Sequence, residues 1–383
     1  MKLKLEGAQR ACTPEETLER MRPYLYSAGI TRIGEITGMD RSGIPVAQSI
    51  RPDAYRLAVD SGKGMTSASA RCSAMMESFE RAVGESHIPT LRAKGKDIGN
   101  AETRFQLLKG AFYNDDIDAD WAEVSEIKSG KRVIVPAPAV MLASPQSLFP
   151  LFAACFTSTS NGLSSGNTLD EAIAGGLYEV IERDQVSCAF AAKKPGKRVD
   201  LDQNASESVG ALVERLRAVD IFPVLFDMTL DFDVPVYVAY LYDKERNVGM
   251  YKGYACHLDP VVAQSRAICE AVQSRTVWMA GSRDDITHEQ FSKSKADDNA
   301  ETLAALLSEA PQVRLDAHED QSQSTFAGDV DVLLKRFETL SLPEPLIKVF
   351  EHPFPCSVVK VLAPGLEGYM HQFGEFGERA LKC

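Results

Sequence analysis

The sequence predicts an α+β protein, and three observations lead to this prediction. Long segments with apolar residues at helical spacing are mixed with short runs of β-branched and aromatic residues. The 383 residues are enough for one large domain or two ordinary ones. Acid-bearing helical segments are spread over residues 73–275, so a split into independent domains would divide any site that they share. We therefore expect one composite domain over residues 30–365.

Composition and charge exclude several classes of protein. Apolar residues make up 44% of the chain and charged residues 25%, which is the balance of an ordinary globular protein. The net charge of −12 argues against a nucleic-acid-binding surface as the main function. No stretch reaches about 18 uninterrupted apolar residues, and no apolar segment follows the first lysines, so we expect neither a membrane span nor a signal peptide. The eight cysteines form no CxxC pair, so we expect a cytoplasmic protein with mostly buried thiols and an exposed Cys383.

Residues 1–29 are expected to form an N-terminal helical extension. Thr13 and Pro14 suit a cap and a first helical turn, two acids follow at the positive end of the helix, and Gly29 suits its end. This pattern predicts a helix over residues 13–27. Strand-like patterns follow it. The expected strands of this part are residues 32–39, 44–50 and 54–59.

Two glycine-rich loops precede long helices in the middle of the chain. The loop 61–64 leads into a helix that reaches about Glu85, and the loop 161–167 leads into a helix over residues 168–190. A third long helix is expected over residues 259–281. The other expected helices are residues 101–111 and 206–219. The expected strands are residues 132–136, 222–227, 234–242 and 248–254, with a buried apolar segment at 148–156.

Residues 282–330 differ in character from the rest of the chain. They are rich in Ser, Asp, Glu, Gln and Lys, which predicts a variable polar insertion whose loop 311–328 is a candidate lid. The last residues, 366–383, are expected to form a tail. The remaining expected elements are helices 287–294, 299–308 and 330–340 and strands 346–350 and 356–361.

The helix that contains Ser73, Glu77 and Glu80 presents these residues on one face. Their spacing of i, i+4 and i+7 stacks them along a helix, and two carboxylates one turn apart repel each other unless a positive group lies between them. That group could be Arg81, a neighbouring lysine or a metal ion. The acid motif therefore points to a charged ligand.

The same spacing of acids recurs on two later helices. The third helix carries an amide in place of its second acid, and both helices also carry an arginine. Such helices can hold hard cations through oxygen ligands, with arginines placed to meet phosphate oxygens. The residues are Glu179, Glu182 and Arg183 on one helix and Glu270, Gln273 and Arg275 on the other.

Other interpretations of these acids fit the sequence less well. A single pair of acids one turn apart is usually a solvated face, but three pairs with apolar neighbours are not typical of one. A di-iron carboxylate site pairs Glu with His three residues on, and no histidine stands there, so oxygen ligands favour Mg²⁺ over iron. No P-loop or dinucleotide fingerprint occurs, and the glycine spacing around Lys63 is wrong for a P-loop. His257, just before the third helix, is expected to be a buried structural histidine.

Taken together, these motifs resemble the three ATP-binding signatures of YcaO-domain enzymes, in order. The connecting phrases at 160–167, 257–260 and 281–285 also resemble that family, and the resemblance covers residues 30–365. It implies a YcaO-type fold in which helices pack on mixed and antiparallel sheets, with the ATP site between the three acidic helices. The motifs are SxxxExxER from Ser73, ExxER from Glu179 and ExxQxR from Glu270.

The resemblance implies ATP-dependent activation of a peptide backbone amide. A nucleophile adds to the amide carbonyl, ATP phosphorylates the resulting oxygen, and phosphate leaves. The family resemblance assigns no catalytic base. It implies that Mg²⁺ is bound by Glu77, Glu80, Glu179, Glu182 and Glu270. It implies that ATP is contacted by Ser73, Arg183 and Gln273, while Lys63, Arg81 and Arg275 either contact ATP or act as structural counter-charges.

The ends of the chain suggest a subtype. Azoline-forming members often finish in a PxPxP tail, whereas residues 377–383 contain no proline, and no peptide-clamp domain precedes residue 30. Both features are more similar to members that make thioamides with an external sulfide source and a TfuA-like partner. Open alternatives are an azoline-forming cyclodehydratase of a ribosomal peptide pathway, a non-catalytic peptide-binding adaptor, and an ATP-dependent enzyme acting on something other than a peptide. The expected partners are a peptide or protein substrate, and a homodimer is a candidate assembly.

Overall fold

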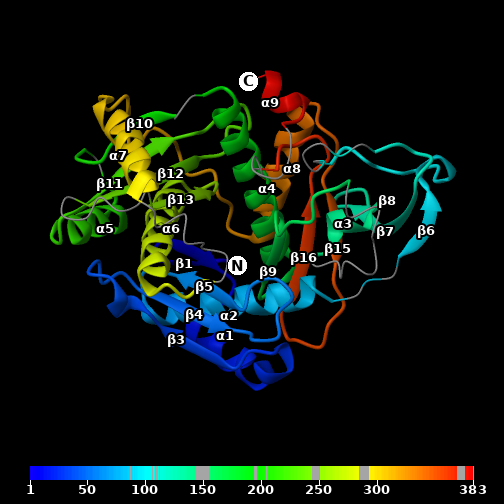
Figure 1. Cartoon of the computed structure of the whole chain (residues 1–383), viewed down its shortest axis with the longest axis horizontal. Coiled ribbons are helices and arrows are strands. Elements are labelled where there is room, and N and C mark those ends of the chain that lie inside the picture. Colours follow the sequence, from blue (N-terminus) through cyan, green and yellow to red (C-terminus); the bar gives the residue numbers. More distant parts are fainter. Residues whose placement is uncertain are drawn as a thin grey trace. The chain divides into compact units, whose positions relative to one another are not determined.

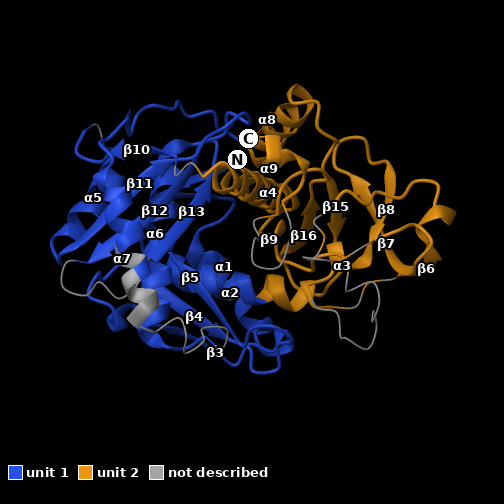
Figure 2. Ribbon diagram, turned by 45° about the horizontal axis from the view of Figure 1, so that its top comes forward, with its two compact units in different colours: residues 1–78, 195–324 blue, residues 79–194, 325–383 orange. Residues whose placement is uncertain are grey.

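A computed structural model of the chain describes residues 1–86, 88, 90–105, 107, 111, 113–142, 155–193, 196–203, 205–243, 251–283, 293–368 and 376–382. They divide into two compact units, each built from two stretches of chain (Figure 2). Unit 1 comprises residues 1–78 and 195–324, and unit 2 comprises residues 79–194 and 325–383. The single composite domain expected over residues 30–365 stays a prediction.

The N-terminal part of unit 1 begins with a hairpin that the sequence did not predict. Strands β1 (Leu3–Leu5) and β2 (Ala8–Arg10) pair antiparallel before helix α1 (Pro14–Met21), which Thr13 caps. The helix expected over residues 13–27 is therefore too long. Pro23 has no N–H to continue the α-helical ladder, so the chain tightens into 3₁₀ turns. These turns are η1 (Arg22–Tyr24) and η2 (Tyr26–Ala28), and Gly29 closes the second in the left-handed conformation.

A three-stranded antiparallel sheet follows in unit 1 and ends at a strand rich in small residues. Its order is β3-β4-β5, with a 3₁₀ turn η3 after β3. The strand expected at 54–59 was wrong, because β5 begins only where that range ends and includes most of the expected glycine loop 61–64. Helix α2 (Ser67–Gly84) follows directly. The bounds are β3 (Arg32–Glu35), η3 (Thr37–Met39), β4 (Val46–Ile50) and β5 (Val59–Lys63).

The second half of unit 1 is a five-stranded sheet in the order β13-β12-β11-β10-β14, on which helix α6 (Pro260–Ala280) packs (Figure 1). Its core is apolar, with Leu225, Tyr237 and Ala267 fully or almost fully buried. Burial of a large apolar side chain such as that of Leu225 contributes about 1.5–3 kcal/mol. The other elements are β10 (Lys197–Asp200), α5 (Glu207–Arg217), β11 (Ile221–Asp227), β12 (Val236–Asp243), β13 (Tyr251–Cys256), α7 (Lys293–Ser308) and β14 (Val313–Arg314).

Unit 2 is built on a sheet of order β6-β7-β15-β16-β9, in which β8 also pairs with β7. Helix α4 (Leu169–Ala191) packs against β16 and β9, and α8 (Phe326–Thr339) packs against α4. In Figure 1, α4 and α8 run beside β16. The other elements are β6 (Leu91–Lys94), η4 (Gly95–Asp97), β7 (Asp118–Glu126), β8 (Arg132–Pro136), α3 (Ala137–Val140), β9 (Leu163–Gly166), β15 (Leu346–Val349), β16 (Ser357–Leu362) and α9 (Glu378–Lys382).

Most of the expected α+β elements are present, and the errors have local causes. The helix expected over residues 101–111 is wrong at its described start, because Ala101 bridges Ile134 in an extended conformation. The loop expected at 311–328 is interrupted by β14 and ends where α8 begins, and its residues 311–324 belong to unit 1, where the Gln321 N–H donates to the Leu258 carbonyl. Its role as a lid stays a prediction. Residues 148–154, most of the helix expected at 287–294, and Cys383 lie outside the described residues.

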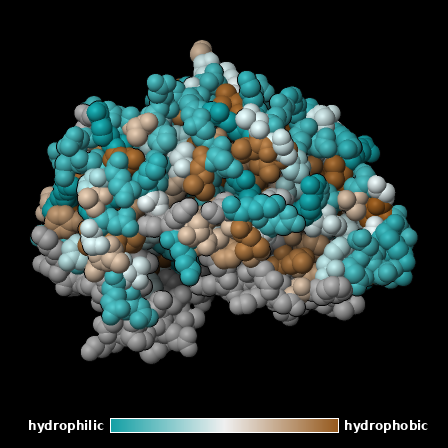
Figure 3. Space-filling view, turned by 90° about the horizontal axis from the view of Figure 1, so that it is seen from above, coloured by the Kyte–Doolittle hydropathy of each residue, from teal (hydrophilic) through white to brown (hydrophobic). Residues whose placement is uncertain are grey.

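The buried groups and the surface agree with the composition. Of the seven described cysteines, four are buried, and all seven are free thiols. His257 is buried, and burial holds its pKa well below the ordinary value, so it is the structural histidine that the sequence predicted. Hydrophilic residues cover much of the face in Figure 3, with apolar patches between them. Within the described residues, no helix has the length and apolar character needed to cross a membrane.

Candidate functional site

Helix α2 starts from strand β5 at very close range. Thr66 caps it, because its Oγ1 accepts a hydrogen bond from the Ser69 N–H at 3.1 Å. A Cβ added at Gly62 would lie 2.0 Å from the Ala74 nitrogen and 2.4 Å from the Ala70 carbonyl oxygen. Only glycine lets the strand and the helix backbone approach this closely. Ser73 and Glu77, one turn apart on this helix, are both partly exposed in unit 1.

Helix α6 repeats this arrangement on strand β13. A Cβ at Gly253 would lie 2.3 Å from the Ala271 nitrogen and 2.4 Å from the Ala267 carbonyl oxygen. The two helices even share the pattern Ala-x-Cys-x-Ala at the contact, at residues 70–74 and 267–271. Asp259 caps α6 by accepting from two backbone N–H groups, and Gly281 ends it in the left-handed conformation. The helix is therefore fixed at both ends and along its contact with the sheet.

Three predicted site residues come together between β5 and α6 in unit 1. The Lys63 ammonium lies 2.6 Å from the Glu270 carboxylate, and the two side chains are 19% and 29% exposed. Glu270 also accepts from the Tyr254 N–H at 3.4 Å. The Gln273 amide donates to the Ser61 carbonyl oxygen at 3.4 Å. Within the described residues, the buried Gln273 Oε1 and Ser61 Oγ have no hydrogen-bond partner.

This group fits the ligands that the resemblance implies. Two buried polar atoms without a partner are costly, and a bound polar ligand would satisfy them. Carboxylate and amide oxygens suit Mg²⁺, and a lysine ammonium suits a phosphate oxygen. Within the part of the chain that the structure describes, however, no three His, Cys, Asp or Glu side chains are grouped as metal ligands. Glu270 is engaged by Lys63 instead.

Arg275 lies in different surroundings from the other site candidates. Its guanidinium is 3.0 Å from an Asp40 oxygen and 2.8 Å from an Asp243 oxygen, and all three side chains are almost fully buried. Its guanidinium also lies over the Tyr251 ring, at 5.2 Å from the centroid. These contacts favour the interpretation of Arg275 as a structural counter-charge, although the acids that it neutralises are not those of the three motifs.

Helix α4 carries the second motif in unit 2. Arg183 lies 3.6 Å from Glu179 and 3.8 Å from Glu182, so the arginine leans along its own helix toward both acids. The three side chains are 28%, 26% and 12% exposed, which leaves the group accessible to a ligand. Glu80 and Arg81, at the end of α2, also belong to unit 2 and are partly exposed.

Sequence reasoning missed Glu171 in the first turn of α4. It is 6% exposed and accepts from the Asn167 N–H at 2.8 Å. Asn167 follows Gly166, where a Cβ would lie 2.6 Å from the Ala172 nitrogen. Glu171 thus occupies the same local position as Glu270, which precedes Ala271 and accepts from the N–H that follows Gly253. The signal in the sequence was a glycine in the strand before each helix, together with a glutamate directly before the helix alanine that lies against this glycine.

Sequence reasoning also missed Asp184, directly after the ExxER motif. This aspartate is fully buried and lies 2.8 Å from the Arg379 Nε through both carboxylate oxygens. It also accepts from the Glu367 N–H at 3.0 Å. Glu367 in turn accepts from the N–H groups of Gly377 and Ala380. The C-terminal helix α9 is therefore anchored to the motif helix α4.

Comparison with known protein families gives a match over most of the chain. The profile of the YcaO family, described as a cyclodehydratase that binds ATP and Mg²⁺, matches residues 61–367. All the predicted site residues lie inside this range. The match therefore includes the three motif helices α2, α4 and α6.

Individual proteins extend the match to nearly the full length. A protein of Methanothermobacter thermautotrophicus is 34% identical over 370 residues, covering 94% of this chain and 95% of its own. A protein of the tfuA 3′ region in Rhizobium leguminosarum bv. trifolii is 30% identical over 393 residues, covering 97% and 92%. The structure of YcaO from Methanopyrus kandleri bound with AMPPCP and Mg²⁺ aligns with a TM-score of 0.78 at 24% identity, covering 98% of both chains. At that identity the structural likeness shows the fold.

Proposed function

The chain belongs to the YcaO family, and on this premise we propose that it activates a peptide backbone amide by ATP-dependent phosphorylation of the amide oxygen. ATP and Mg²⁺ are the expected cofactors and are those of the family. An amide oxygen is a very poor leaving group. Bound MgATP supplies the phosphoryl group that turns it into a good one, with the metal screening phosphate charge.

The contact of Lys63, Glu270 and Gln273 carries the proposal. Glu270 and Gln273 come from the third predicted motif and Lys63 from strand β5, and they meet around polar atoms that lack a partner among the described residues. In the proposed site, Glu270 serves as an oxygen ligand, and Lys63 exchanges its carboxylate partner for a phosphate oxygen. Gln273 orients the nucleotide through its unsatisfied carboxamide oxygen.

The acids of α2 and α4 are the other proposed ligands. Glu77, Glu80, Glu179 and Glu182 provide further oxygen ligands, and Ser73 and Arg183 contact the nucleotide. Arg183 is suited to this role because its guanidinium is partly exposed and can meet phosphate oxygens through several N–H groups. Arg81 is retained as a second cation toward the phosphates, whereas the ion pairs of Arg275 leave it a supporting role.

The proposed product is a thioamide, made with an external sulfide source and a TfuA-like partner protein. The observation that favours it is the relative of the tfuA 3′ region, which shares 30% identity over nearly the whole chain. The second candidate is an azoline-forming cyclodehydratase, favoured by the description of the matched family as a cyclodehydratase. Both reactions use the same activation of the amide oxygen and differ in the nucleophile.

The two products differ in mass, which provides the test. Exchange of oxygen for sulfur at a planar amide adds about 16 Da, and loss of water to form an azoline removes about 18 Da. We expect peptides that are about 16 Da heavier in cells that contain the gene than in cells from which it is deleted. Purified protein should also turn over ATP only when the unmodified form of the peptide that changes mass is added. ATP turnover without any peptide dependence, or no mass change in either direction, would contradict the proposed activity, whereas water loss alone would overturn only the thioamide.

A further inference from the structure

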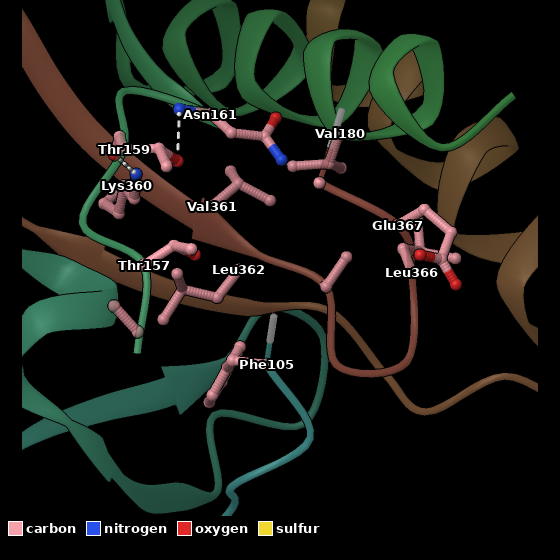
Figure 4. Close-up of a pocket in the computed structure, with 13 residues that line it drawn as sticks. Phe105, Thr157, Thr159, Asn161, Val180, Lys360, Val361, Leu362, Leu366 and Glu367 are labelled. Carbon is pink, nitrogen blue, oxygen red and sulfur yellow. Dashed lines mark hydrogen bonds between the residues drawn. The ribbon is translucent and has the colours of Figure 1, made fainter. Parts of the chain in front are cut away.

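Unit 2 contains a pocket of about 60 Å³, several times the space that one water needs. Its walls come from the loop before β9, from α4, from β16 and from the loop after β16 (Figure 4). Phe105, Val180 and Leu362 contribute apolar surface, and Thr157 and Asn161 contribute polar groups. No described residue of this pocket was among the predicted site residues.

The wall that carries Asn161 is held at an unusually short distance from β16. A Cβ at Gly162 would lie 2.2 Å from the Val361 carbonyl oxygen, and Gly162 has a φ of +77°. On the other side, a Cβ at Gly176 of α4 would lie 2.6 Å from a Val361 methyl group. Because glycine is needed at both contacts, the loop, the strand and the helix are packed to fixed distances. The pocket is therefore preformed.

Opposite charges offset each other in the pocket wall. Lys360 and Glu367 are 2% and 4% exposed, and both line the pocket. Lys360 donates to the Thr159 carbonyl oxygen, and Glu367 accepts from the N–H groups of Gly377 and Ala380. One cation and one anion leave the wall with no net charge. Such a wall favours a neutral polar ligand over a carboxylate or a phosphate.

The Asn161 carboxamide supplies the specific recognition group. In Figure 4 its side chain extends from the loop, with the amide nitrogen toward Val180 and the oxygen toward helix α4. Its buried Oδ1 has no hydrogen-bond partner among the described residues. A carboxamide both donates and accepts, so its natural complement is another amide, whose N–H satisfies the oxygen. The apolar neighbours leave room for a small apolar group beside that amide.

From these contacts we propose that this pocket binds one backbone amide of a peptide, with a small apolar side chain seated against Val180 and Leu362. The proposal deepens the proposed function, on which it rests, by assigning a subsite for the peptide. Val180 is adjacent to Glu179 in sequence, so the same helix carries the peptide subsite and the acids of the second motif. If the pocket accepts only a small side chain, the substrate peptide must carry a small apolar residue next to the amide that is activated.

The test is a titration of the full-length protein with N-acetyl-L-alanine N-methylamide, followed by NMR of labelled methyl groups. It requires neither ATP nor turnover, so its outcome is separate from that of the proposed activity. We expect saturable shifts of the methyl groups of Val180, Val361 and Leu362. Sodium acetate and inorganic phosphate should give no saturable shift, and N-acetyl-L-phenylalanine N-methylamide should bind more weakly because the pocket is small.

Two variants localise the binding. Ala363→Phe places a ring at the pocket wall and should abolish the saturable shifts, whereas Ala317→Phe, on an exposed turn of unit 1, should leave them unchanged. Asn161→Ala removes the amide partner and should weaken binding about tenfold, the value of one hydrogen bond. Absence of saturation, equal binding of acetate or phosphate, or unchanged affinity in both pocket variants would overturn the proposal.

Discussion

Helices α4 and α6 each carry an acid motif that ends in an arginine, but the two arginines have different surroundings. Arg183 is 28% exposed and lies 3.6–3.8 Å from acids of its own helix. Arg275 is buried and bound to Asp40 and Asp243, which come from outside its helix. The cause is the spacing. Arg183 follows Glu179 by four residues, about 40° around the helix, whereas Arg275 follows Glu270 by five residues, about 140° around it.

The difference between the two arginines shows that the function of a motif residue depends on its angular position around the helix and not only on its residue type. At α4 the arginine shares the face of the acids, and it can serve the same ligand. At α6 the arginine faces the core, and the cation near Glu270 is Lys63 from strand β5. Sequence reasoning could have separated the two cases by counting the helical angle.

The largest expected effect is the loss of stability in Arg275→Ala. Removing one partner from a buried ion pair leaves the other charges uncompensated and costs about 3–5 kcal/mol. Chemical denaturation of the purified protein measures this loss. The matched change Arg217→Ala, at an exposed pair with Asp202, should cost no more than about 1 kcal/mol. If Arg183→Ala destabilised the protein as much as Arg275→Ala, the difference between the two arginines would be refuted.

Removal of a motif acid should have the next largest effect, on turnover. Glu270→Gln and Glu182→Gln should each lower peptide-dependent ATP turnover about 100-fold, which corresponds to about 2.7 kcal/mol of transition-state stabilisation. Stability should hold or rise in Glu182→Gln, where one of two neighbouring acids loses its charge, whereas Glu270→Gln also removes the ion pair with Lys63 and should cost up to about 1 kcal/mol. Glu214→Gln, on the exposed face of α5, is the control and should leave both properties unchanged.

Glu171→Gln sharpens the same comparison. Glu171 and Glu270 occupy equivalent positions after a strand glycine, and glutamine can still accept the backbone hydrogen bond from Asn167. If the equivalence extends to function, turnover in Glu171→Gln falls as it does in Glu270→Gln while the melting temperature is kept. Full turnover in Glu171→Gln would mean that the two positions share only their local structure.

How far the sequence predicts this structure depends on where the determining contact lies. The bounds of α4 and α6 were predicted closely because their caps, Thr168 and Asp259, lie beside them in sequence. Strand β5 was predicted in the wrong place, because Gly62 suggests a loop unless one knows that the α2 backbone lies against it. The three motifs were found from spacing alone. The pairing of Lys63 with Glu270 could not be predicted in this way, because 207 residues separate the two in sequence.

The third effect concerns the glycines that set these contacts. Gly253→Ala would place a Cβ 2.3 Å from the Ala271 nitrogen, so the strand and α6 must move apart, at a cost of about 1–3 kcal/mol. Thermal unfolding of the purified variant measures this loss of stability. Gly210→Ala is the matched control, because its Cβ would meet only Ala205 at 3.7 Å, and inside helix α5 alanine should stabilise by roughly 0.5–1 kcal/mol. Equal effects at both positions would remove the argument from close approach.

The smallest effect is a pH dependence, and it separates a titratable ion pair from the permanent ones of Arg275. His318 Nε2 lies 2.7 Å from Asp227 in unit 1 and helps to tie residues 311–324 to the sheet. The hydrogen bond and the charge of Asp227 raise the pKa of His318 above its ordinary value, with a further contribution from Asp233, while partial burial and Lys197 oppose this. A raised folded-state pKa stabilises the contact below the ordinary pKa, and that stabilisation is lost as the pH rises through the raised value.

Hydrogen exchange should detect this loss locally. After correction for the intrinsic pH dependence of exchange, amides of residues 315–323 should be less protected at pH 9 than at pH 6, and those of α5 should not change. His318→Gln keeps a hydrogen-bond donor but cannot titrate, so the pH dependence should disappear in that variant. Protection that stays constant with pH in the unaltered protein would show that the hydrogen bonds of Gln264 to Leu315 and of Gln321 to Leu258 hold the segment without the charged pair.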